Sequence, residues 1–490
     1  MTAGRCDCRP SQKLDKTIVM KGHEAIPGRQ NARTISLERR GLESIPLSER
    51  HGRPFSQFTL WLGANLTIAT FALGFLPIRL GLPWAWTIAA ILAGNLLGSI
   101  GLGAAAATGP ATGLPQMALA LSVFGSVGGR LPALLNYLST VGWYTVNTIL
   151  AAFGVRLLLP GLTFWEAALI LVAVQTSFAA YGHDIVHRFE SVMSIVLGLA
   201  FAGLAGYAVV HGARLGHYHG HGHGLWAAFA IVAAATLSAL GSWSPYGSDY
   251  SRYLPAETSS RATFLWASAG GFAASVWLEL LGAAVAVFAG ANNHDPVAAA
   301  HMTLGGLGNL AVIAIILGAI AANAVNGYSN SLSALAVGIP LPRWALAILG
   351  AAMGLTASLL SSGHFDGDYE NFLLLLGYWF MPWLGIQVVD FFILQRGKRR
   401  GRQTFAVAIP ATAALLAGVA CEVPFMTGAL YTGPLVHQLG GANISLYVGF
   451  MVSAATYYLA MTRSLVGHPR TRGLGKSGVE IPTAEAERLR

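Results

Sequence analysis

Long apolar runs separated by short polar segments dominate the pattern of this 490-residue chain. Runs of roughly 17–25 residues suffice for a helix to cross the hydrocarbon core of a bilayer. Twelve such runs lie near 58–78, 84–106, 132–153, 163–181, 190–210, 225–252, 262–290, 309–337, 343–361, 371–394, 403–422 and 443–462. A soluble core rarely contains a dozen of them, so the pattern predicts an all-α membrane protein with twelve transmembrane helices.

The sixth run changes character before its helix could finish crossing the membrane. Seventeen almost wholly apolar residues, 225–241, are followed by Ser242, Trp243 and a stretch of Ser, Pro, Gly and Asp up to Asp249. Backbone outside a helix cannot face lipid, because each unpaired N–H or C=O group there costs several kcal/mol. We therefore expect an opened helix that lines a watery cavity, which is where many transporters hold their substrate.

The first run carries a weaker signal of the same kind. Gly63 and Asn65 stand at mid-depth, where they weaken the helix and offer polar groups. If helices 1–5 and 6–10 form two inverted repeats, the interruptions occupy matching places, and helices 11 and 12 lie outside the repeats. The residues expected at the unwound part of helix 1, with a possible cation site, are Gly63, Ala64, Asn65 and Thr67.

Composition and charge agree with a membrane protein and indicate its orientation. The chain is 54% hydrophobic and 10% charged, whereas soluble domains have about 25% charged residues. If the N-terminus is cytoplasmic, 27 of the 30 Lys and Arg residues fall on the cytoplasmic side. The positive-inside rule thus predicts a multi-pass protein of the plasma or inner membrane with both termini cytoplasmic. It explains the net charge of +9 without binding to nucleic acid.

Three parts of the chain follow from this pattern. Residues 1–53 and 465–490 are expected to be cytoplasmic tails, and 54–464 the transporter domain. The outer segment 211–223 alternates His and Gly, a composition that can bind transition metals, although a flexible loop is the simpler interpretation. No resident metal, cofactor or obligate protein partner is expected. His183 and His187, with Asp184 between them, are four residues apart and could share a helical face. No third metal ligand accompanies this pair, so we do not expect an enzyme.

Polar stripes on two other helices are expected to converge on the same cavity. Trp143 and Asn147 share a face of helix 3, and Asn323 and Asn326 share a face of helix 8. Amides offer donors and an acceptor to a neutral ligand, and Trp143 and Trp243 could clamp a flat ring. For any single residue the alternative remains open, since amides also join membrane helices and Trp marks the bilayer interface.

Several segments resemble, in the same order, those of the purine–cytosine permeases in the nucleobase:cation symporter family. The similar segments are 38–52, 58–65, 142–147, 241–255, 326–333 and 369–379. The resemblance implies a LeuT-type fold and uptake of a nucleobase by cation symport. It implies substrate contacts at Trp143, Trp243, Asn147, Asn326 and Ser242, with Asn323 a weaker candidate because its spacing from Asn326 differs from some relatives. Hydantoin, allantoin and thiamine-like compounds remain alternative substrates, and a non-transporting sensor is an alternative role.

The coupling ion is the point where the sequence departs from sodium-coupled relatives. Those proteins bind Na⁺ with helix 1 carbonyls and helix 8 hydroxyls, whereas Ile320, Ala321 and Ala322 are apolar here. We therefore expect proton coupling, or a sodium site of different composition. Glu279 is the deepest acid, and an ionisable residue at that depth is a candidate for proton coupling by default. It could instead be a protonated or hydrogen-bonded carboxyl that joins helices.

Overall fold

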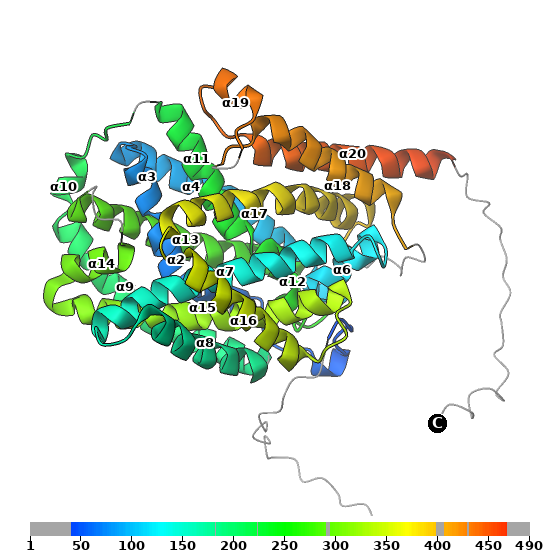
Figure 1. The fold of residues 1–490 in the computed structure, drawn as a ribbon. Helices are drawn as coiled ribbons and strands as arrows, with labels where there is room; N and C mark the ends of the chain where they lie inside the picture. The colour runs from blue at the N-terminus through cyan, green and yellow to red at the C-terminus, as the bar shows by residue number, and fades with distance from the viewer. Residues whose placement is uncertain are drawn as a thin grey trace, which may run out of the picture. The chain divides into compact units, whose positions relative to one another are not determined.

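The apolar runs form helices throughout the part of the chain that a computed structural model describes, residues 41–181, 183–222, 224–290, 295–397, 406–428 and 431–467 (Figure 1). These residues contain no strand and belong to the compact unit Leu37–Arg490. Helices up to the middle of the chain are α1 Phe55–Asn65, α2 Ile68–Leu73, α3 Phe75–Arg79, α4 Trp84–Ala106, α5 Gly109–Thr112, α6 Gln116–Phe124, α7 Arg130–Leu158, α8 Phe164–Tyr181, α9 His183–Val210 and α10 Ala213–Gly216.

The remaining helices are α11 Leu225–Gly241, α12 Gly247–Ser251, α13 Ser260–Ala289, α14 Pro296–Leu304, α15 Gly308–Val337, α16 Arg343–Ser361, α17 Phe365–Val388, α18 Ile409–Glu422, α19 Pro434–Gln438 and α20 Ser445–Gly467. Short 3-10 turns occur at Leu47–Glu49, Ser244–Tyr246, Gly305–Leu307 and Val423–Phe425, and a π-helical turn, Val389–Leu394, continues α17.

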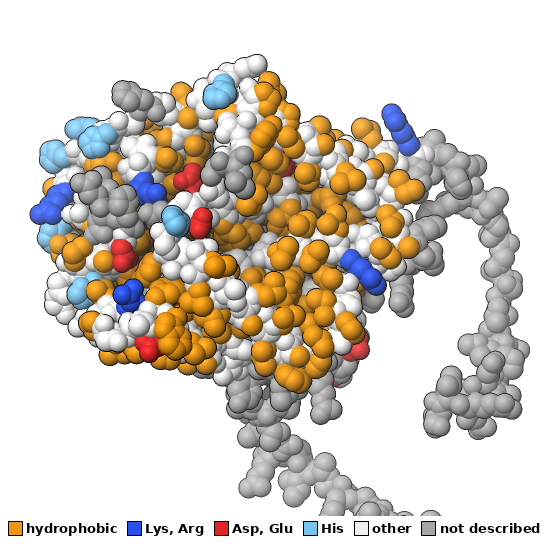
Figure 2. All heavy atoms as spheres, viewed as in Figure 1, with side chains coloured by type: hydrophobic (Ala, Val, Ile, Leu, Met, Phe, Trp, Pro, Cys, Tyr) orange, Lys and Arg blue, Asp and Glu red, His pale blue; other side chains and the backbone are white. Residues whose placement is uncertain are grey.

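The membrane-spanning pattern expected from the sequence is present. Among the described residues, seven helical stretches are long and apolar enough to cross a membrane, and the bent pair formed by α1 and α2–α3 is an eighth. Shorter apolar helices in α8, α9 and α18, together with α20, account for the remaining predicted runs. Figure 2 shows hydrophobic side chains over most of the visible face, between charged side chains towards the left and right. The prediction of an all-helical membrane fold is confirmed.

The packing of the helices repeats after five membrane helices. The central contact joins α7 and α15, the third helices of the two expected repeats. The second helix of the first repeat, α4, packs extensively on α11, and its counterpart α13 packs on α1 in the same way. The contacts of α7 with α8 and of α15 with α16 form another matching pair. This exchange symmetry is the one expected of two inverted five-helix repeats.

The interruptions of helices 1 and 6 differ in kind. Leu66 (φ −75°, ψ 65°) and Thr67 (φ −125°, ψ 158°) leave the helical region between α1 and α2, where the axis bends by 63°. In helix 6, Ser242 and Trp243 keep helical dihedrals, and the chain passes through a 3-10 turn into α12. Pro245 stands in the first turn of that segment, where a missing N–H is tolerated. Helix 6 therefore continues as a 3-10 turn where we expected unwound backbone. The backbone that leaves the helical conformation lies in helix 1.

The second half of helix 1, formed by α2 and α3, lies directly against α13. A Cβ atom added to Gly282 would collide with the carbonyl oxygen of Phe71, and one added to Gly74 would collide with the carbonyl oxygen of Glu279. Such a close approach requires glycine on both helices. It fixes the position of Glu279 relative to the break in helix 1.

Residues 41–53, which the sequence pattern assigned to the tail, pack against the ends of the helices. The Ile45 side chain is 1% exposed, and its N–H donates to the Gly113 carbonyl at 2.9 Å. Arg252, after α12, donates to the Gly41 carbonyl at 3.0 Å. This segment therefore forms part of the folded protein.

Candidate functional site

A cavity of about 330 Å³ lies where the break in helix 1 faces α7, α13, α15 and α17. Its lining residues are Ala64, Asn65, Thr67, Thr70, Trp143, Asn147, Ala239, Trp243, Ser275, Glu279, Ala322 and Tyr369. Seven residues predicted from the sequence are among them. The other four, Gly63, Ser242, Asn323 and Asn326, lie outside this lining set.

The two predicted tryptophans line the cavity, and each is held by a hydrogen bond from its indole N–H. Trp143 donates to Ser242 Oγ at 3.0 Å, so Ser242 supports the ring from behind. Trp243 donates to Asn65 Oδ1 at 3.0 Å, which joins helix 6 to the last turn of α1. Both rings pack edge-to-face on other aromatic rings, and the Trp143 centroid lies 5.4 Å from that of Phe372. The rings are therefore fixed before a ligand arrives.

The amides of α7 and α15 form one connected network. Asn147 Nδ2 and Asn326 Nδ2 both donate to Asn323 Oδ1, at 3.1 and 3.2 Å. Asn323 Nδ2 in turn donates to the Tyr144 carbonyl at 3.1 Å and to the side chain of Gln175 at 3.1 Å. Asn147 lines the cavity, while Asn323 joins it to Asn326. The sequence predicted this convergence of α7 and α15 but not the central place of Asn323.

Glu279 is fully buried and lines the cavity. One carboxyl oxygen accepts a hydrogen bond from Asn95 Nδ2 of α4 at 2.6 Å, and the other has no partner within the described part of the chain. Ser275, one helical turn earlier, donates to Asn65 Oδ1 at 3.3 Å. We did not predict Asn95, although it is the one amide in its apolar run. A buried carboxyl with an unpaired oxygen can exchange a proton with the cavity.

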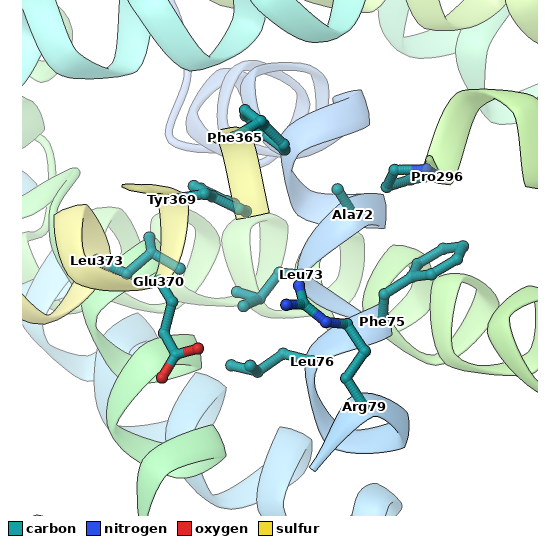
Figure 3. Close-up of a pocket in the computed structure, with 10 residues that line it drawn as sticks. All are labelled: Ala72, Leu73, Phe75, Leu76, Arg79, Pro296, Phe365, Tyr369, Glu370 and Leu373. Carbon is teal, nitrogen blue, oxygen red and sulfur yellow. The ribbon is translucent and has the colours of Figure 1, made fainter. Parts of the chain in front are cut away.

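Tyr369 of α17 lies on the wall of the cavity and also on the wall of a second pocket, which Figure 3 shows. It lines both, and its hydroxyl donates to the Ala69 carbonyl of α2 at 2.9 Å. The second pocket, of about 380 Å³, also contains Arg79 of α3 and Glu370 of α17, as Figure 3 shows. Tyr369 begins the segment 369–379 that resembles the permeases, but its position on the cavity wall was not predicted.

The helix 8 positions at which sodium-coupled relatives carry hydroxyls are buried and apolar here, at Ile320, Ala321 and Ala322. Within the described ranges, no three His, Cys, Asp or Glu side chains gather as metal ligands would. The side chains of His183, Asp184 and His187 lie outside the described residues.

In the His-rich segment 211–223, the backbone N–H groups of His221 and Gly222 donate to the Gly81 carbonyl, so this segment packs on the end of helix 1. His223 lies outside the described residues.

Comparisons with known proteins identify the family of the chain. The family described as "Permease for cytosine/purines, uracil, thiamine, allantoin" matches residues 44–452. A putative purine-cytosine permease of Bacillus subtilis, YxlA, is 30% identical over 450 residues, which cover 87% of this chain and 96% of that protein. The purine-cytosine permease fcyB of Emericella nidulans is 27% identical and covers 87% and 88% of the two chains.

The fold is similar to that of a solved transporter. Mhp1, a nucleobase-cation-symport-1 family transporter in a closed conformation with bromovinylhydantoin bound, superposes with a TM-score of 0.71 at 18% identity, covering 89% of this chain and 97% of that one. This likeness confirms the LeuT-type arrangement of helices. Because the family match spans most of the chain, including every membrane helix except most of the last one, the protein belongs to the permeases for cytosine/purines, uracil, thiamine, allantoin.

Proposed function

We propose that this permease imports a nucleobase, a purine or cytosine, across the cell membrane by symport with protons. The observation that carries the proposal is the cavity between Trp143 and Trp243, two fixed indoles from different repeats with the amide of Asn147 at its edge. A flat heterocycle presents two π faces and a polar rim, and aromatic stacking contributes about 1–3 kcal/mol per base. In this proposal both termini are cytoplasmic and the substrate enters from the side of Tyr369.

Proton coupling is supported by the composition of the cavity wall. Glu279 brings a carboxyl group to the cavity, and the helix 8 side chains that would supply hydroxyl ligands to sodium are apolar. Protonation from the outside would neutralise Glu279 while the carrier is open outwards, and release of the proton to the cytoplasm would complete the cycle. Uptake should therefore rise as the outside pH falls.

Uptake of labelled cytosine and hypoxanthine in cells without their own nucleobase carriers tests the proposal. We expect accumulation to persist when sodium is replaced by choline and to collapse with a protonophore. Glu279→Gln keeps an oxygen for Asn95 but cannot carry the proton, so it should lose accumulation and retain exchange of internal for external base. Glu422→Gln, a second buried carboxyl that lies outside the cavity lining, is the matched control and should accumulate normally.

Two results would contradict parts of the proposal. Accumulation that requires sodium and ignores the protonophore would assign the coupling to sodium. Absence of uptake of either base, with good expression in the membrane, would move the substrate to hydantoin, allantoin or thiamine-like rings, which the same assay can test as competitors. A protein that binds a base but moves none would be a sensor.

A further inference from the structure

We infer that Asp249 is a positioning residue for transport. Together with Gln116 and Ser329 it forms a latch that holds the inner half of helix 6, residues 244–251, in a closed position. The inference rests on the proposed function for its orientation, in which this end of the helix faces the cytoplasm. It concerns the step in which the base leaves the cavity.

The inner half of helix 6 lies between the cavity and the cytoplasmic end of the protein. It begins beside Trp243, which lines the cavity, and it is followed by Arg252, which donates to the Gly41 carbonyl of the N-terminal segment. Every residue from Leu240 to Leu254 is buried. We therefore expect a base to leave on this side when the segment separates from the helices around it.

Asp249 ties this segment to two other elements. One of its carboxyl oxygens accepts from the Gln116 N–H at 2.8 Å, and the other accepts from the Ser329 hydroxyl at 2.8 Å. Gln116 Oε1 in turn accepts from the Ser248 N–H at 3.1 Å, so α6 and α12 hold each other by reciprocal bonds. Because α6 lies between helices 2 and 3 and α15 is helix 8, the latch joins the two repeats.

The closed position leaves other polar groups of the segment unsatisfied. The hydroxyls of Ser244, Tyr246 and Ser248 are buried and have no hydrogen-bond partner in the described part of the chain. Buried polar groups without partners are unfavourable, and these hydroxyls would gain water if the segment opened. The bonds to the Asp249 carboxylate offset this bias, since such bonds are roughly twice as strong as those between neutral groups.

A polar latch suits a contact that breaks in every transport cycle. When an apolar contact separates, hydrocarbon surface becomes exposed to water. When the latch separates, its groups exchange protein partners for water, so the net change in free energy is small. The closed and open positions can then differ by an amount that the loss of a single bond is enough to shift.

Two variants weaken the latch at different bonds. Ser329→Ala removes the hydroxyl that bonds to Asp249, and Gln116→Ala removes the oxygen that accepts from α12. Loss of a bond to a carboxylate in the closed position alone shifts the populations by about tenfold. Tyr457→Phe is the matched control, because it removes a hydroxyl that bonds to buried Asp390 at 2.7 Å, between α20 and the π-helical turn after α17.

Labelling of a cysteine in the cavity measures opening on each side of the membrane. In a background that lacks the three native cysteines, Ala322→Cys places a thiol on the cavity wall. A membrane-impermeant methanethiosulfonate reagent is applied to inside-out vesicles and to intact cells. We expect Ser329→Ala and Gln116→Ala to raise the labelling rate about tenfold in the vesicles but not in the cells. Tyr457→Phe should leave both rates unchanged.

The outcomes separate the inference from the proposed function. Labelling of the vesicles that neither latch variant changes would overturn the latch and leave a nucleobase carrier. Faster labelling from both sides would mean that these bonds only stabilise the fold, which would also overturn it. Faster labelling in intact cells alone would support the latch and invert the proposed orientation. If one latch variant does not reach the membrane, the other still decides.

Discussion

At the residue scale, the indole of Trp143 is expected to contribute to substrate binding in two ways, by stacking on the base and by the hydrogen bond to Ser242 that holds the ring. Trp143→Phe keeps an aromatic face but loses the hydrogen bond to Ser242, which is worth about 1 kcal/mol, so KM for uptake should rise about fivefold. Trp143→Ala also loses stacking and should raise KM by more than about tenfold. Trp226→Phe, at an indole that is 68% exposed and outside the cavity lining, should leave KM unchanged. Equal effects of Phe and Ala at position 143 would argue against stacking on this ring.

Gly282 illustrates a residue that matters for its lack of a side chain. Gly282→Ala would push α13 from the Phe71 carbonyl, so we expect little folded protein in the membrane and a lower melting temperature. Gly203→Ala in α9 meets open space and should be neutral or slightly stabilising, because Ala favours helix over Gly by about 1 kcal/mol. Thermal unfolding of the two purified variants, followed by fluorescence-detected gel filtration, compares them. Similar melting temperatures for Gly282→Ala and Gly203→Ala would mean that α13 can move away from α2 at little cost in stability.

At the scale of elements, the break in helix 1 depends on a single cap. Thr67 Oγ1 accepts from Thr70 N–H at 3.2 Å and starts α2. Thr67→Ala should cost about 1 kcal/mol and raise KM severalfold, whereas Thr67→Ser should resemble wild type. Asp295 caps α14 in the same manner outside the cavity lining, so Asp295→Ala should lower stability alone. Melting temperature and uptake, measured for each variant, distinguish a loss of stability from a loss of transport. A KM for Thr67→Ala equal to that of the wild type would refute a role of the cap in transport.

The same elements show how far the sequence predicts the fold. Apolar periodicity and length located all twelve runs, because burial in lipid imposes a continuous apolar stretch. The form of the two interruptions was less predictable. Pro and Gly after Gly241 predicted unwound backbone in helix 6. Proline is also tolerated at the start of a 3-10 turn, and the packed helices around this segment favour that turn. Leu66, where the backbone of helix 1 opens, has no sequence signal of its own.

Spacing within a single helix predicted two of the residues that line the cavity. Trp143 and Asn147 share a helical face, and the structure places both on the cavity. Contacts between distant segments could not be read in this way. Asn95 reaches Glu279 across 184 residues of sequence, and Tyr369 reaches the Ala69 carbonyl across 300. Periodicity gives the face of a helix but not the helix that it meets.

At the scale of the whole molecule, the charge distribution predicts an orientation that thiol labelling can check. In a background lacking Cys6, Cys8 and Cys421, His219→Cys places a thiol in the outer His-rich segment and Leu47→Cys, at a side chain that is 70% exposed, places one at the inner side. A membrane-impermeant maleimide should label the first in intact cells and the second only after permeabilisation. The reverse pattern would invert the topology and the direction of transport with it.

The buried amide of Asn323 has a practical consequence for changing what the carrier accepts. Asn323 lies outside the cavity lining, yet its oxygen accepts hydrogen bonds from Asn147 and Asn326 and so determines how these two amides are turned. Directed-evolution libraries restricted to cavity-lining positions would therefore leave out a residue that holds the Asn147 amide of the cavity wall in place. Natural divergence of substrate range between paralogues could likewise proceed while the visible pocket stays the same, and transporter specificity assigned by comparing lining residues alone would then be misjudged.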